Sequence, residues 1–232
     1  MSFLTKLITG VLATVGLTTS PARAQAPAGK SSASTVLVLA RDQLSANSAT
    51  SGFHGYGIPY EVLMVPQGGV TLPPLNSSAT AGNYGGFVVM SELSYSYPDG
   101  WHSALTTEQW DTIYAYQSTF GARMVRIDAY PGDPFGTTTA IPGAGCCDTG
   151  VDQPISISDS SAFPGASLKT GVGMSTAGLW HYPATITNST TTKEFAQFGP
   201  AGQFSGTSTA AVINNFGNGR EQMVWFTSWA TD

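Results

Sequence analysis

Charged residues are scarce in this 232-residue chain: lysine, arginine, aspartate and glutamate together make up 10%, well below the quarter that is usual in globular domains. There is no run of lysines and arginines, and the formal net charge is −5. The sequence therefore argues against nucleic acid and anionic membranes as partners. Serine, threonine, asparagine, glycine and proline are abundant instead, a composition that favours short strands, turns and a surface of hydroxyls and amides.

Cysteine is almost absent, because Cys146 and Cys147 are the only two and they are adjacent. Neighbouring Cα atoms lie about 3.8 Å apart, whereas a disulfide prefers about 5.5–6 Å. A bond between them would close a strained ring, and the glycines around the pair would permit the unusual turn. Extracellular thiols oxidise, so we expect this disulfide in a secreted chain. Two free thiols, or a bond to another chain, are the alternatives.

Catalytic signatures are also lacking. The segment 173–177 misses the G-x-S-x-G pattern at its last position, and neither a Walker loop nor H-E-x-x-H occurs. The three histidines lie far apart in the sequence: His54, His102 and His181. The sequence therefore predicts no catalytic residue, no metal and no cofactor. One alternative stays open, a stand-alone small α/β hydrolase or deacetylase in which histidines converge with Asp42 or Asp128 into a triad or a metal site.

The first 24 residues have the pattern of a secretory signal peptide. Lys6 precedes an apolar run that is too short to span a bilayer, and small residues precede a cleavage point after Ala24. Loss of Lys6 and Arg23 changes the formal net charge from −5 to −7. We expect a secreted protein, extracellular or in the cell wall, with no membrane partner. Two sequons, at Asn76 and Asn188, predict glycosylated surface positions.

Hydrophobic patterning divides the remaining chain into three parts. Residues 25–34 form a polar linker. Apolar runs at 35–42, 58–67, 82–93 and 122–131, with a helix over 105–122, predict a parallel α/β sheet in residues 35–131. Residues 132–232 predict a β-rich second half packed on or inserted into that sheet, with strands at 153–158, 166–172, 178–187, 194–200, 209–216 and 220–229. Asn218-Gly219 predicts a hairpin turn, and the last strand is free to rejoin the sheet.

Aromatic residues beside polar partners in turns suggest sugar binding, because aromatic rings stack on the apolar faces of pyranoses. The candidate contacts are Trp101, His102, Trp180, His181 and Tyr182, with Asp128 and Asp133 at the rim. An exposed loop tryptophan is costly without a function. Trp110, Trp225 and Trp229 are instead expected in the core.

Several long runs, in order, resemble one known family: VLVLARD, SATSGFHGYGIPYEVLMVPQGG, GWHSALTTEQW, FGARMVRIDAYPG, TTTAIPGAGCCDTG, GLWHYPATITN and QMVWFTSWATD. Over roughly residues 35–232 the chain is similar to the N-terminal carbohydrate-binding module, family 87, of the fungal galactosaminogalactan deacetylases. The resemblance implies binding of an α-1,4-linked exopolysaccharide rich in N-acetylgalactosamine. It also implies a catalytic deacetylase domain as a partner.

The chain departs from these deacetylases at its end. The family continues beyond Asp232 into a metal-dependent esterase domain, whose Asp and His motifs have no match here. The resemblance therefore implies a non-catalytic module and no esterase activity. A short independent protein and the front of a longer deacetylase both fit the sequence. A cell-wall structural protein with no discrete ligand site is a third reading.

Overall fold

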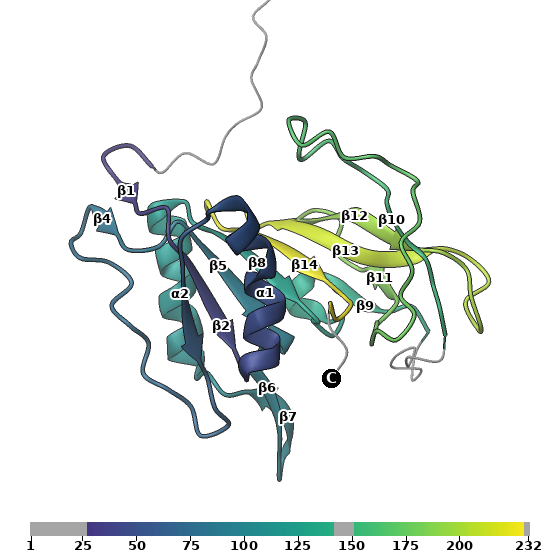
Figure 1. The fold of residues 1–232 in the computed structure, drawn as a ribbon, viewed down its shortest axis with the longest axis horizontal. Coiled ribbons are helices and arrows are strands. Elements are labelled where there is room, and N and C mark those ends of the chain that lie inside the picture. The colour runs from purple at the N-terminus through teal and green to yellow at the C-terminus, as the bar shows by residue number, and fades with distance from the viewer. Residues whose placement is uncertain (1–26, 142–150, 230–232) are drawn as a thin grey trace, which may run out of the picture.

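The structure, a computed structural model, describes residues 27–141 and 151–229. Its main feature is one ten-stranded mixed sheet whose central path runs β10-β12-β13-β14-β8-β5-β2-β3 (Figure 1). The predicted disulfide at Cys146 and Cys147 and the predicted signal peptide lie outside the described residues. Within the described ranges, no helix is long and apolar enough to cross a membrane.

The first half of the chain builds the parallel part of the sheet, as the sequence predicts. Its strands are β2 (Val36–Ala40), β3 (Tyr60–Met64), β5 (Gly86–Met90) and β8 (Arg123–Ile127). β2 and β5 are short apolar runs and are almost fully buried, whereas β3 and β8 also carry charged residues and are less buried. All pair in parallel, so their carboxyl ends lie at one edge.

The second half extends the same sheet with antiparallel strands. These are β10 (Ile155–Ile157), β12 (Thr192–Phe198), β13 (Ser208–Asn215) and β14 (Glu221–Trp225), with β9 (Thr137–Thr139) and β11 (Ala184–Ile186) beside β13. The last strand, β14, pairs in parallel with β8 and joins the two halves. The predicted α/β class, with a parallel first half and a β-rich second half, is therefore confirmed, and Asn218-Gly219 lies in the β13–β14 turn as expected.

Two predicted details differ from the structure. Residues 166–172 form turns and irregular structure rather than a strand, because their apolar side chains Leu168 and Val172 find no core and stay exposed. A hairpin that the sequence analysis missed joins β6 (Ser94–Tyr97) to β7 (Gly100–Ser103). Short elements complete the fold: β1 (Ser31–Ser32), β4 (Ala81–Gly82), η1 (Ser91–Leu93) and η2 (Asp133–Phe135).

Two helices cover opposite faces of the parallel part. Alternate residues of a strand point to opposite faces, so Val38 packs with Ala46 of α1 (Gln43–Tyr56). Leu39 packs with Ile113 of α2 (Thr107–Phe120) on the other face. Thr106 caps α2 in a capping box, and Gly121 ends it at φ 67°. The helix predicted over 105–122 is confirmed, and it begins and ends two residues inside that range.

A buried polar row crosses the sheet where its two halves meet. Arg126 Nε donates to Gln222 Oε1 at 3.1 Å, and Gln222 Nε2 donates to Asn214 Oδ1 at 2.9 Å. Asn214 Nδ2 then donates to Thr192 Oγ1 at 2.9 Å. The four residues lie on the adjacent strands β8, β14, β13 and β12, and each is at most 3% exposed. Pairing each donor with an acceptor fixes the register of these strands, because an unpaired buried polar group is costly.

Removal of Arg126 should destabilise the whole domain. Arg126→Ala leaves Glu92 and Gln222 without their buried partner, so we expect the free energy of unfolding to fall by about 3–5 kcal/mol. Chemical denaturation followed by circular dichroism measures this. Arg123→Ala is the matched control on the same strand. Its half-exposed pair with Glu221 should contribute at most about 1 kcal/mol, and equal losses in the two variants would contradict the prediction.

The start of α1 supplies a second prediction, on pH. Asp42 accepts hydrogen bonds from Ser45 N and Ser45 Oγ, each at 2.8 Å, and these bonds, the backbone one first, lower the pKa of the Asp42 carboxyl. The ionised cap therefore stabilises the fold above the ordinary aspartate pKa of about 4, and its contribution is lost as pH falls through the lowered folded-state pKa.

Asp42→Ala should cost about 1 kcal/mol at neutral pH. The difference from the wild type should close as the solution is acidified, which thermal unfolding at several pH values would show. Asp111→Ala, a change at an exposed helical aspartate, should leave both stability and its pH dependence within about 0.5 kcal/mol. A pH-independent cost at Asp42 would contradict this interpretation.

Candidate functional site

The carboxyl edge of the parallel strands is the first place to look for a site, because open α/β sheets bind ligands there. Asp42 follows β2 at this edge, and its side chain caps α1, which gives it a structural role. After β5, Ser91, Glu92 and Leu93 have φ of 49°, 52° and 53°, and Asp128 after β8 has φ of 61°. Such left-handed backbone costs about 1–3 kcal/mol per residue and gathers at functional sites.

Polar contacts hold these strained loops together. Ser91 Oγ donates to Asp128 Oδ2 at 2.6 Å, and Arg126 Nη1 donates to Glu92 Oε2 at 2.5 Å. Burial raises the pKa of Glu92, and the Arg126 charge opposes that rise. Asp128 N also donates to Thr227 O at 3.0 Å. The loops after β5, β8 and β14 therefore form one rigid unit.

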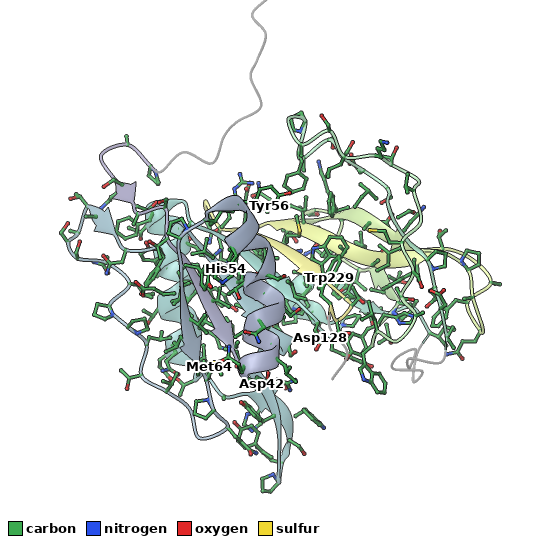
Figure 2. All side chains as sticks on the ribbon, in the orientation of Figure 1. Asp42, His54, Tyr56, Met64, Asp128 and Trp229 are labelled. Atoms are coloured by element: carbon green, nitrogen blue, oxygen red, sulfur yellow. The ribbon has the colours of Figure 1, made fainter. Side chains whose placement is uncertain are left out.

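A groove of about 600 Å³ lies beside this unit, between α1 and the segment after β14. It is lined by Leu44, Asn47, Ser48 and Ser51 of α1, by Ile127 and by Trp229. The Trp229 ring is 43% exposed and packs edge-to-face on Trp225, with centroids 5.0 Å apart. Figure 2 shows Trp229 and Asp128 on the side of α1 that faces the β-rich half. An exposed indole in the same groove as hydroxyl and amide groups offers the chemistry that binds a sugar.

Trp101 and His102 lie on the β6–β7 hairpin, which projects beyond the parallel strands (Figure 1). The Trp101 side chain is 72% exposed. His102 stacks on Tyr97 with centroids 3.9 Å apart, and its Nε2 lies 3.3 Å from Asp99 Oδ1. Tyr97 OH donates to Gln67 O at 2.7 Å and anchors the hairpin. Trp101 is thus an exposed ring on a hairpin that is held in place by these contacts.

Trp180, His181 and Tyr182 lie beside the end of β14. Ser228 N donates to Trp180 O, and Tyr182 N donates to Phe226 O, each at 2.8 Å. Trp180 is 40% exposed, whereas His181 is fully buried, with Nε2 3.1 Å from Gln153 Oε1. The His181 side chain therefore supports this segment from the inside. Because Asp128 N also bonds to the end of β14, Asp128, Trp180 and Tyr182 share one neighbourhood.

Tyr130 and Asp133 belong to the loop that follows β8. The Tyr130 ring is 51% exposed and lies 5.3 Å from the Tyr182 ring. Asp133 is exposed at the start of η2. Tyr130 therefore adds a ring to the Trp180 and Tyr182 segment, which the sequence analysis did not foresee.

The three histidines do not converge. His54 of α1 has a ring nitrogen 2.5 Å from Tyr60 OH at the start of β3. His102 contacts Asp99 on the hairpin, and His181 contacts Gln153 in the β-rich half. In the described parts of the chain, no three His, Cys, Asp or Glu side chains gather as a metal site would require. These contacts place the three histidines in three different parts of the described structure.

The structure also shows the exposure of the two predicted glycosylation sites and of Trp229. Asn76 and Asn188, the predicted glycosylation sites, are both exposed. Trp229, which the sequence analysis expected in the core, is a groove wall. The available signal was its position after Thr227-Ser228, where the apolar strand pattern has already ended. Trp229 is expected in the core because the last strand is predicted over 220–229, whereas β14 ends at Trp225.

Comparisons with known proteins agree with a carbohydrate-binding role. The family described as Agd3 CBM87 matches residues 32–232, whereas none of the curated proteins matches. A solved structure described as "Crystal structure of Agd3 a novel carbohydrate deacetylase" is 57% identical, with a TM-score of 0.81. The match covers 86% of this chain and 30% of that one, so the chain spans less than a third of the Agd3 deacetylase. The resemblance inferred from the sequence is confirmed, and the chain belongs to the Agd3 CBM87 family of carbohydrate-binding modules.

Proposed function

We propose that this chain is a secreted, non-catalytic module that binds an α-1,4-linked, N-acetylgalactosamine-rich exopolysaccharide and normally works beside a deacetylase domain. The observation that carries the proposal is the groove lined by the exposed Trp229 and by polar side chains of α1, in a chain of the CBM87 family. Its place of action is outside the cell or in the cell wall, as the N-terminal sequence pattern suggests.

The groove suits a pyranose ring on both of its sides. The half-exposed Trp229 indole supplies an apolar face. Opposite it, Gln43 Nε2 donates to Asn47 Oδ1 at 2.8 Å and orients that amide, while the Asn47 Nδ2 donors make no hydrogen bond within the described residues. Ser48 and Ser51 add hydroxyl groups. A sugar lying on the indole would therefore meet oriented donors at its rim.

Further contacts are proposed at the rings exposed along the same edge. Trp101 with His102 forms one platform, and Trp180 with Tyr182 forms another, with Asp128 and Asp133 nearby. The buried His181 acts by holding Trp180 and Tyr182 in place. Several separate platforms suit an extended polymer, because occupation of one raises the effective concentration of the chain at the next.

Loss of the Trp229 ring should weaken polysaccharide binding. We expect the purified wild-type chain to bind galactosaminogalactan oligomers saturably, and Trp229→Ala to bind them roughly tenfold less tightly, as loss of an aromatic contact of about 1.4 kcal/mol implies. Isothermal titration calorimetry measures both affinities. Tyr56→Ala, which removes an aromatic ring that is 85% exposed at the far end of α1, should match the wild type.

If the wild-type chain binds neither acetylated nor partly deacetylated galactosaminogalactan oligomers, the proposed function is wrong. If the wild type binds but Trp229→Ala is unchanged, the function stands and the groove is not its site. The same titration with Trp101→Ala and Trp180→Ala then tests the other two platforms.

Salt should weaken binding to a partly deacetylated polymer. The mature chain carries a formal net charge of −7 and the deacetylated sugars carry ammonium groups, so their long-range attraction is screened by ions. We expect the association constant to fall several-fold between about 50 and 500 mM NaCl, and a fully acetylated polymer to show a smaller change. Affinities that respond to neither salt nor acetylation would contradict a role for net charge.

A further inference from the structure

A row of flat side chains connects α2 with the β13–β14 turn, outside the groove and the platforms described above. Trp110 and Tyr114 of α2 stack with centroids 5.8 Å apart and an interplanar angle of 23°. The Arg220 guanidinium lies 4.1 Å from the Tyr114 ring centroid and 3.7 Å from that of Phe216. Arg220 is thus clamped between two aromatic rings.

The charge of Arg220 has no acidic partner among the described residues. The ion pairs there engage His102, Arg123 and Arg126 instead. The nearby Arg126, whose Nη2 donates to Tyr114 OH at 2.8 Å, is already neutralised by Glu92. Burial lowers the pKa of Arg220, and repulsion from Arg126 acts in the same direction. This end of the row therefore carries one uncompensated positive charge.

The edge of the guanidinium is available to a ligand. The Tyr114 and Phe216 ring centroids lie 4.1 and 3.7 Å from its central carbon, and the Arg220 side chain makes no hydrogen bond within the described part of the chain. Its Nε is buried without a partner, whereas its two terminal nitrogens are not among the buried unpaired atoms and reach solvent. Stacking of this kind could serve packing alone, but it also holds the fork of donors in one orientation at little further entropic cost.

We propose that Arg220 is a specificity-determining residue that recognises N-acetyl groups of the polysaccharide, an inference that rests on the function proposed above. An acetamido group offers a carbonyl oxygen to the terminal nitrogens of Arg220 and a methyl group to the neighbouring rings. The amine left by deacetylation is protonated at neutral pH, has no acceptor for Arg220 and is repelled by its charge. Net charge attracts a cationic polymer from a distance, whereas Arg220 selects acetylated sugars on contact.

The test compares the affinities of two matched polymers, fully acetylated and fully deacetylated galactosamine oligomers of equal length, by isothermal titration calorimetry. In Arg220→Gln, the ratio of the acetylated to the deacetylated association constant should fall roughly tenfold, because a charge-assisted hydrogen bond is lost and a repulsion is relieved. Lys193→Gln removes one exposed positive charge from β12 and should leave the ratio at the wild-type value.

Arg220→Lys provides a second variant that keeps the charge and the aliphatic stem but removes the planar fork. It should also lower the ratio, by weakening binding of the acetylated oligomer. An unchanged ratio in folded Arg220→Gln and Arg220→Lys, with the wild type still binding, would overturn the role of Arg220 and leave the proposed function intact. Arg220-dependent binding of inorganic sulfate, with no dependence on acetylation, would also overturn it, in favour of a simple anion site. A wild-type chain that binds neither oligomer would refute the proposed function itself.

Discussion

The guanidinium of Arg126 lies where the parallel and antiparallel halves of the sheet meet, and both halves depend on its contacts. Its Nε donates to Gln222 and so begins the polar row that reaches β12. Its terminal nitrogens bind Glu92 and Tyr114, and its face lies 4.6 Å from the Trp110 ring centroid. A buried charge requires such complete pairing, and this requirement ties the loop after β5 and the helix α2 to one point in the core.

The paired Arg126 fixes the core beneath the loops that follow the strands. Exposed aromatic rings on these loops are therefore held in fixed positions on a surface with few charges. The strained loops after β5 and β8 are joined through Ser91 and Asp128. The end of β14 bonds to Asp128 and to the Trp180 segment. Rings on rigid supports lose little entropy when they meet a ligand. In the proposed function, a neutral or cationic polymer would meet stacking faces and hydroxyl groups without strong competing charges.

The proposed binding mode separates long-range from local recognition. Low charge density and a net negative charge would set a weak, salt-sensitive attraction for cationic sugars. Local contacts at Trp229 and Arg220 would then decide which sugar residues are held. A module that distinguishes acetylated from deacetylated stretches would be useful beside a deacetylase, since the substrate and the product of that enzyme differ in this group.

Much of the fold could be predicted from the sequence, because its signals are local. The apolar runs of β2, β5 and β8, the Thr106 cap and the Gly121 stop of α2 depend on neighbours in the chain, and the family follows from long contiguous motifs. The site could be predicted only in part. His181 is buried, Trp229 is exposed, and Arg220 lies between Tyr114 and Phe216. Each of these features depends on contacts between segments that are far apart in the sequence. Only tertiary packing decides such contacts, since it determines which side of a residue faces solvent.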